Sequence, residues 1–302
     1  MKRRPDLLDE NCPTGLEIFQ ITEEDIPSSH VYMEAQIFTP DSERFILHRS
    51  ATPHGSDRDD PRHRYLLCDL SNDGELIPLT DEKGTTGPAI SPDGQHLYYF
   101  IDQTKPGSGR IMLRRVALDG TGRETILELE DALTGSDLFL SRLYPLSTIS
   151  SDGRRIIISG FLGDGQTEGA PWGFIRVDLD SAEVEVVPLG EDWFNLHPQY
   201  CRSRNPGENR DLLVQHNHDG LRDAAGEGVR ATAGAGCDVH VIRDDGSDLR
   251  DMPWGRDGNE FCQGHQCWIG RTVRGITSTG TREPAMECGD SSPLCRFPLS
   301  LN

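Results

Sequence analysis

The chain has 302 residues, of which 50 are acidic and 30 basic, so its formal net charge is −20. A field of this sign repels polyanions, and we expect neither nucleic acid nor an anionic membrane as a partner. No apolar run approaches the roughly 18 residues of a membrane span, and no apolar segment follows the basic start of the chain, as a secretory signal would require. The expected location is therefore cytoplasmic, where the eight cysteines would be reduced.

In chain order, the clearest pattern is a tight turn followed by a short apolar strand. The turn recurs at residues 39–42, 91–94 and 150–153, with a degenerate copy from 203 to 212. Proline fixes φ early in the turn, aspartate tolerates the next position, and glycine or serine accepts the strained third one. A second hairpin follows within each copy, for example residues 65–70 with 76–79. Four strands at a period of about 50 residues are typical of propeller blades.

We therefore predict an all-β fold, a β-propeller of four-stranded blades over residues 16–280. About five blades are recognisable at this period. Residues 1–15 are predicted as an N-terminal tail and 281–302 as an irregular C-terminal tail. Residues 16–21 are interpreted as an outer strand that closes the ring, and 224–236 as a flexible loop inserted in the fourth blade. An open arc would expose a blade edge, so self-association through that edge is expected.

Three polar clusters lie beside these strands, at residues 196–199, 215–218 and 258–268. Either they converge on one cavity or they are unrelated loops; spacing alone does not decide. His30, His197 and His265 precede positions that line the central channel of a propeller, and His216 ends a strand. His216 and His218 would share one face of a strand, which suits a transition metal, although a turn at 219–220 explains the pattern as well. The acidic run 244–248 is interpreted as a hairpin turn.

Taken in order, four patches resemble the oligogalacturonate lyase family, cytoplasmic seven-bladed propellers that cleave pectin fragments. They are residues 29–32 with 38–41, 193–200, 214–217, and 241–247 followed by Gly264-His265-Gln266-Cys267-Trp268. The last patch resembles the family's Thr-His-Glu-Phe-Trp motif. The resemblance implies a β-propeller enzyme that acts on an oligogalacturonide or another uronate.

The implied reaction is β-elimination, in which a histidine removes the proton next to a uronate carboxylate while manganese neutralises that carboxylate. His265 matches the family's base, and the expected substrate-binding residues are His30, His197, Gln199, His216, Gln263 and Trp268. The family holds its metal with three histidines and a glutamine of its last blades. No such segment follows Trp268, so we predict no metal ligands in this chain. The alternative function is a non-catalytic propeller that serves as a ligand- or protein-binding scaffold.

Overall fold

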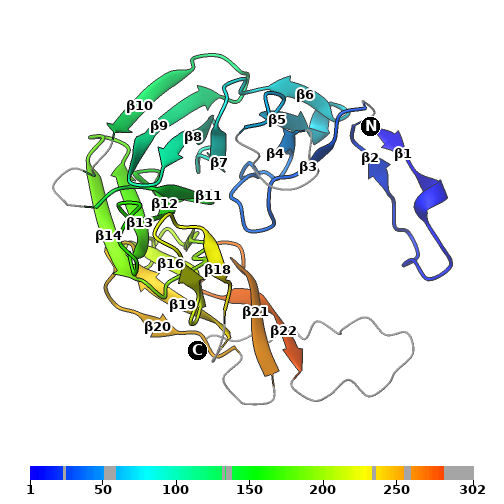
Figure 1. Cartoon of the computed structure of the whole chain (residues 1–302). Coiled ribbons are helices and arrows are strands. Elements are labelled where there is room, and N and C mark those ends of the chain that lie inside the picture. The colour runs from blue at the N-terminus through cyan, green and yellow to red at the C-terminus, as the bar shows by residue number, and fades with distance from the viewer. Residues whose placement is uncertain are drawn as a thin grey trace.

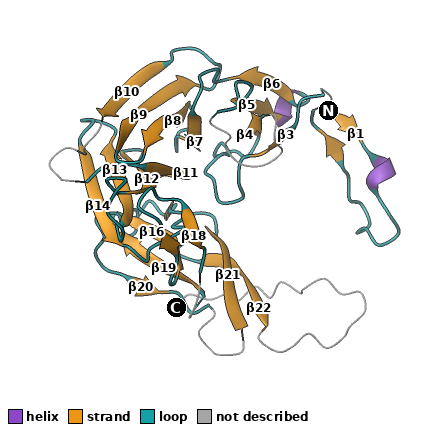
Figure 2. Ribbon diagram, in the orientation of Figure 1, coloured by secondary structure: helices purple, strands orange, loops and turns teal. Residues whose placement is uncertain are grey.

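The computed structural model describes residues 1–22, 25–50, 59–130, 133, 138–232, 236–254 and 260–281. The described strands form antiparallel sheets that follow one another around an open arc (Figure 1). Strands dominate, and the helical elements of the described residues are two short 3-10 turns, η1 (Pro5–Leu7) and η2 (Leu70–Asn72) (Figure 2). The predicted β-propeller of four-stranded blades is therefore confirmed. No helix in the described part of the chain is long and apolar enough to cross a membrane.

Four blades follow each other along the chain. The first three are antiparallel sheets of four strands in sequence order, and the fourth is part of a larger, six-stranded sheet. Blade 1 comprises β3 (Ser28–His30), β4 (Arg44–Arg49), β5 (Arg64–Asp69) and β6 (Glu75–Pro78). Blade 2 comprises β7 (Thr85–Ile90), β8 (His96–Lys105), β9 (Ser108–Ala117) and β10 (Glu124–Glu130). Blade 3 comprises β11 (Arg142–Ile149), β12 (Arg155–Phe161), β13 (Trp172–Asp178) and β14 (Val184–Gly190). Blade 4 comprises β15 (Gln199–Tyr200), β16 (Asp211–Asn217), β19 (Cys237–Arg243) and β20 (Arg250–Asp251).

A last hairpin, β21 (Glu260–Trp268) and β22 (Gly275–Thr281), joins blade 4 through a single register pair, Cys237 with Cys262. It occupies the place where the sequence predicts a fifth blade. The predicted C-terminal tail from 282 onward lies outside the described residues.

The repeated turns close as the sequence predicts. In each copy the fourth and last turn residue, Ser42, Gly94 or Gly153, has a left-handed φ of 63°, 70° or 75°. Its amide donates to the carbonyl of the first turn residue at 2.8 Å in all three copies. The hydroxyl of that first residue also donates to the turn aspartate, as in the 2.5 Å bond from Ser91 to Asp93. These local bonds fix the hairpin at the base of each of the first three blades.

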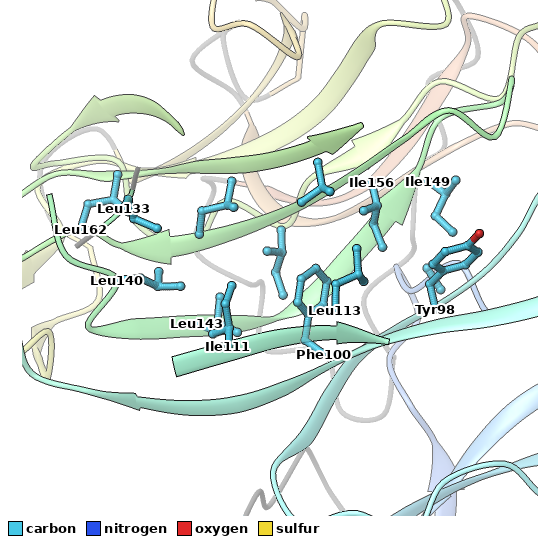
Figure 3. Packing of buried hydrophobic residues seen from close by; sticks show 14 residues of the cluster. Tyr98, Phe100, Ile111, Leu113, Leu133, Leu140, Leu143, Ile149, Ile156 and Leu162 are labelled. Carbon is cyan, nitrogen blue, oxygen red and sulfur yellow. The ribbon is translucent and has the colours of Figure 1, made fainter. Parts of the chain in front are cut away.

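The core lies between neighbouring blades, because each sheet buries both faces. Figure 3 shows the cluster between blades 2 and 3, where Phe100 and Leu113 face Leu143 and Ile156. Similar clusters fill the spaces between blades 1 and 2, blades 3 and 4, and blade 4 and the last hairpin. Each fully buried side chain of this kind contributes about 1.5–3 kcal/mol, so adjacent blades support each other.

Two predicted segments differ from expectation. Within residues 16–21, Phe19–Gln20 forms β2, which pairs with β1 (Lys2–Arg3) of the expected N-terminal tail instead of closing the ring. Because a two-residue strand has few bonds, its partner is decided by tertiary contacts that periodicity does not reveal. The expected loop in blade 4 contains a hairpin strand, β18 (Gly228–Arg230), that pairs with β17 (Leu221–Arg222).

Candidate functional site

A buried histidine, His197, links segments of three different blades. It directly precedes β15 and is only 3% exposed. Its Nδ1 bonds the carboxylate of Glu34, which lies between β3 and β4, and its Nε2 bonds the hydroxyl of Tyr144 on β11. Since the carboxylate accepts, Nδ1 carries the proton of this contact. Asn195 Oδ1 lies 2.9 Å from the same Nε2. The result is a carboxylate–imidazole–phenol chain, the arrangement by which a side chain is oriented for proton transfer.

His265 lies near this chain and shares a ring neighbour, Tyr32, with His197. The ring of Tyr32 meets His197 edge-on at 5.4 Å and lies 6.2 Å from the ring of His265. His265 is exposed and sits where the β21–β22 register shifts, between Gly264 and Cys267. The structure thus brings the sequence-predicted base close to the predicted substrate residue His197.

Both histidines have unusual backbone conformations. The φ angles of His197 and His265 are 43° and 56°, and Asn195 has a φ of 66°. A left-handed conformation costs a residue with a side chain roughly 1–2 kcal/mol, and such residues cluster at functional sites. The strain therefore supports a role for this region beyond packing.

Arg222 is a residue that sequence reasoning missed. Its guanidinium lies 3.5 Å from the ring centre of Phe194 and 5.8 Å from that of Trp172. Burial, followed by the charge of Arg142, lowers the pKa of Arg222 to about 10, and the phenol of Tyr144 also acts on it. Its Nε is buried with no hydrogen-bond partner, and among the described residues no carboxylate forms an ion pair with it. A half-buried cation without a bound anion is suited to an acidic ligand.

Gln199 and Trp268, both expected to bind substrate, instead join the inner strands of blade 4 and the last hairpin. The Gln199 amide donates to the Gln266 carbonyl at 2.5 Å, and the Trp268 indole donates to the Gln199 carbonyl at 2.9 Å. Trp268 also lines a cavity of about 360 Å³ together with Arg202 and Arg271. Their observed contacts are structural, and substrate binding by them stays a prediction.

The remaining predicted residues lie elsewhere. His30 is exposed at the end of β3, two residues before Tyr32. The side chain of Gln263 lies outside the described residues. His216 faces away from β21, because its neighbour Gln215 occupies the side toward Gly264. Its ring contacts are with Trp193 and other histidines of blade 4 and not with His197. The three polar clusters thus converge only in part.

The residues around His265 do not fit a manganese ion. Manganese prefers carboxylate, carbonyl and water oxygens. Glu34 is the carboxylate near Tyr32, and it is already bonded to His197. The one group of three potential ligands that the described residues bring together is formed by His216, His218 and His240, which excludes His265 and offers only nitrogen. The side chains described around His265 therefore do not form the oxygen-rich set that manganese prefers.

Neither a protein-family model nor a curated protein sequence matches the chain. Several solved propellers do match. An oligogalacturonate lyase in complex with manganese is 19% identical, with a TM-score of 0.59, over 87% of this chain and 63% of that one. An oligogalacturonate lyase from Vibrio parahaemolyticus is 19% identical, with a TM-score of 0.64, over 94% of this chain and 66% of that one.

A putative TolB from Agrobacterium tumefaciens is 14% identical, with a TM-score of 0.51, over 88% of this chain and 74% of that one. This chain spans about two thirds of the length of the two lyases. At such identities these likenesses establish the propeller fold, and the resemblance to oligogalacturonate lyases holds at the level of the fold.

Proposed function

We propose that this protein binds a short uronic-acid oligosaccharide at the inner ends of blades 1, 3 and 4 and cleaves it by β-elimination. The observation that carries the proposal is the hydrogen-bonded chain Glu34–His197–Tyr144, with Arg222 beside it and His265 near the same Tyr32 ring that His197 contacts. This set offers a base, an acid and a cation, which are the three parts that the elimination requires. The likeness of the fold to two oligogalacturonate lyases supports the choice of substrate class.

His265 is the proposed base. It removes the proton from the carbon next to the uronate carboxylate, and the electron pair of that C–H bond forms a double bond to the adjacent carbon. The bond from that adjacent carbon to the glycosidic oxygen breaks, and the oxygen leaves with the electron pair. The exposed imidazole of His265 is open to a ligand, and an imidazole in this role contributes typically 10²–10⁴-fold.

Tyr144 is the proposed acid. Burial, reinforced by Tyr32 and Glu34, raises the pKa of its phenol well above the ordinary value, so the hydroxyl is protonated at neutral pH. A protonated phenol can transfer its proton to the leaving oxygen. His197 holds the phenol oxygen in place, and Glu34 fixes the ring of His197. Glu34 and His197 are therefore positioning residues.

Arg222 is the proposed partner of the substrate carboxylate. Removing a proton next to a carboxylate places more negative charge on it, and a cation at that point stabilises the charge that develops. The cation also offsets locally the repulsion between an acidic sugar and a chain of net charge −20. Its stacking on Phe194 holds the guanidinium plane in one orientation.

The test is to incubate the full chain with digalacturonate and longer galacturonides, in the presence of a chelator, and to follow the absorbance of the unsaturated product. We expect product from the wild type, loss of turnover in His265→Ala, and a fall in kcat of about 10²–10³-fold in Tyr144→Phe. Arg222→Gln should raise KM. His96→Gln, in blade 2, is the matched control and should retain full activity.

Calorimetry with the same sugars separates the alternatives. Binding without any product, at high protein concentration, would contradict the elimination and favour the non-catalytic scaffold. Neither binding nor product would exclude uronates altogether.

A further inference from the structure

Three histidines of blade 4 lie together outside the proposed sugar site. In the antiparallel pair β16–β19, His216 is opposite Asp238 and His240 is opposite Val214, so the two histidines project diagonally from the same face of the sheet. His218 follows His216 by two residues, just beyond the end of β16. The ring of His216 lies 4.0 Å from that of His218 and 5.7 Å from that of His240. The neighbouring strands β16 and β19, together with the residue that follows β16, thus bring three imidazoles close together.

The nitrogen atoms are close enough to share one ion. One ring nitrogen from each histidine lies within 4.8 Å of the other two. Tetrahedral coordination with metal–nitrogen bonds of about 2.0–2.1 Å needs nitrogens about 3.4 Å apart. Small side-chain rotations therefore suffice, because His218 is at the end of its strand.

Carboxylates orient two of the three rings. His218 Nε2 lies 2.8 Å from Asp238 Oδ2, and His240 Nδ1 lies 3.0 Å from Asp251 Oδ1. Metal-ligating histidines usually give one ring nitrogen to a carboxylate and the other to the metal, which fixes the tautomer and the ring orientation. In this cluster Asp238 and Asp251 already form such contacts with His218 and His240. An accidental group of surface histidines would not require it.

His216 supplies the independent sign of a missing ligand. It is 6% exposed, and its Nε2 is buried with no hydrogen-bond partner among the described residues. The closest carboxylate oxygen that it faces, of Asp192, is 3.6 Å away. Trp193 stacks on its ring at 4.2 Å and 8° and prevents the ring from turning out to solvent. Leaving such an atom unsatisfied costs about 1–3 kcal/mol, which a bound ion would remove.

We propose that His216, His218 and His240 bind one zinc-class transition-metal ion, independently of the proposed sugar cleavage. Three neutral imidazoles favour zinc, nickel or copper over manganese or magnesium, which prefer oxygen ligands. Three protein ligands would leave a fourth position for water, and the exposed carboxylate of Asp192, 3.6 Å from His216 Nε2, adds negative charge beside the cluster.

The experiment is a titration of the untagged, chelator-treated full chain with zinc and, separately, manganese, followed by calorimetry. We expect one equivalent of zinc, bound at least 100-fold more tightly than manganese. Cobalt in place of zinc should give the visible spectrum of a tetrahedral nitrogen site. The cobalt should also quench tryptophan fluorescence through Trp193, which directly contacts the cluster.

His218→Gln is the informative variant, because His218 is the most exposed member of the cluster and its loss leaves the strands intact. Zinc binding should weaken at least 100-fold in His218→Gln and in His216→Gln and remain unchanged in His96→Gln, on β8. Circular dichroism confirms that each variant is folded. The proposal is overturned if the wild type binds no stoichiometric zinc, or if folded His218→Gln binds zinc as tightly as the wild type.

Discussion

Asp244 is a carboxylate whose removal should severely destabilise the protein. It follows β19, is 0% exposed, and joins blade 4 to blade 3. It accepts hydrogen bonds from Arg176 at 2.9 Å, from Arg210 at 2.9 Å and from the Tyr200 hydroxyl at 2.9 Å. Asp244→Ala leaves these donors without their shared acceptor, inside the interface between two blades. Breaking a buried ion pair by removing one partner costs about 3–5 kcal/mol, and we expect a loss of that size in the free energy of unfolding.

Asp245, the next residue, provides the control. It is exposed and bonds Arg210 at 2.7 Å at the surface. Because exposed ion pairs contribute about 0–1 kcal/mol, Asp245→Ala should cost less than about 1.5 kcal/mol, including its turn bonds. Urea unfolding of both variants, with the slope compared as well as the midpoint, measures the difference. Equal losses in the two variants, or a loss below about 1 kcal/mol for Asp244→Ala, would refute the reasoning.

Three further predictions concern the core and the inner strands. Trp268→Ala should lower the free energy of unfolding by about 3–5 kcal/mol, because it removes a buried indole and its hydrogen bond; an unchanged urea midpoint would contradict this. Gly264→Ala should lower the free energy of unfolding by about 1–3 kcal/mol, since φ is +80° and the new Cβ would lie 2.0 Å from Gln215 Oε1. A thermal scan tests this prediction, and a variant as stable as the wild type would contradict it. Burial raises the pKa values of Tyr99 and Tyr200 above the unfolded value, so stability is retained below about pH 10 and is lost as pH rises further. Tyrosinate absorbance should therefore rise together with loss of circular dichroism, and ionisation of every tyrosine in a folded chain would rule this out.

The fold was predictable because its signals are local. A Ser-Pro-Asp-Gly turn closes through its own side chains and backbone, as the bonds around Ser91 and Asp93 show, so the sequence alone locates the hairpin. The period of the turns then predicts the blades. Pairing between β1 and β2 was missed because it depends on which distant segment lies alongside Phe19–Gln20. No local pattern carries that information.

The site was predictable only for residues in polar motifs. His197 and His265 stand out in the sequence, and the structure brings both close to the ring of Tyr32. Glu34 and Tyr144 do not stand out, because each is a single polar residue with apolar neighbours on both sides. Strand periodicity shows which face a residue occupies but not which blade that face meets.

The same limit explains two interpretations that were too simple. The acidic run 244–248 is a hairpin turn, as expected, yet its first residue also holds three donors of neighbouring segments. In the sequence, the spacing of His216 and His218 indicates two ligands of a possible metal site. Their third partner, His240, is on the adjacent strand, and only the β16–β19 register brings it to them.

Both proposed sites depend on the short linker between blades 3 and 4. Trp193 stacks on His216 of the histidine cluster. The ring centre of the next residue, Phe194, lies 3.5 Å from the guanidinium of Arg222. Asn195 and His197 follow in left-handed conformations. Because consecutive linker residues serve different sites, a change in the path of the linker would displace contacts of both. The two proposed functions are chemically independent, but both sites are positioned by this linker. The linker packs against the apolar cluster between blades 3 and 4.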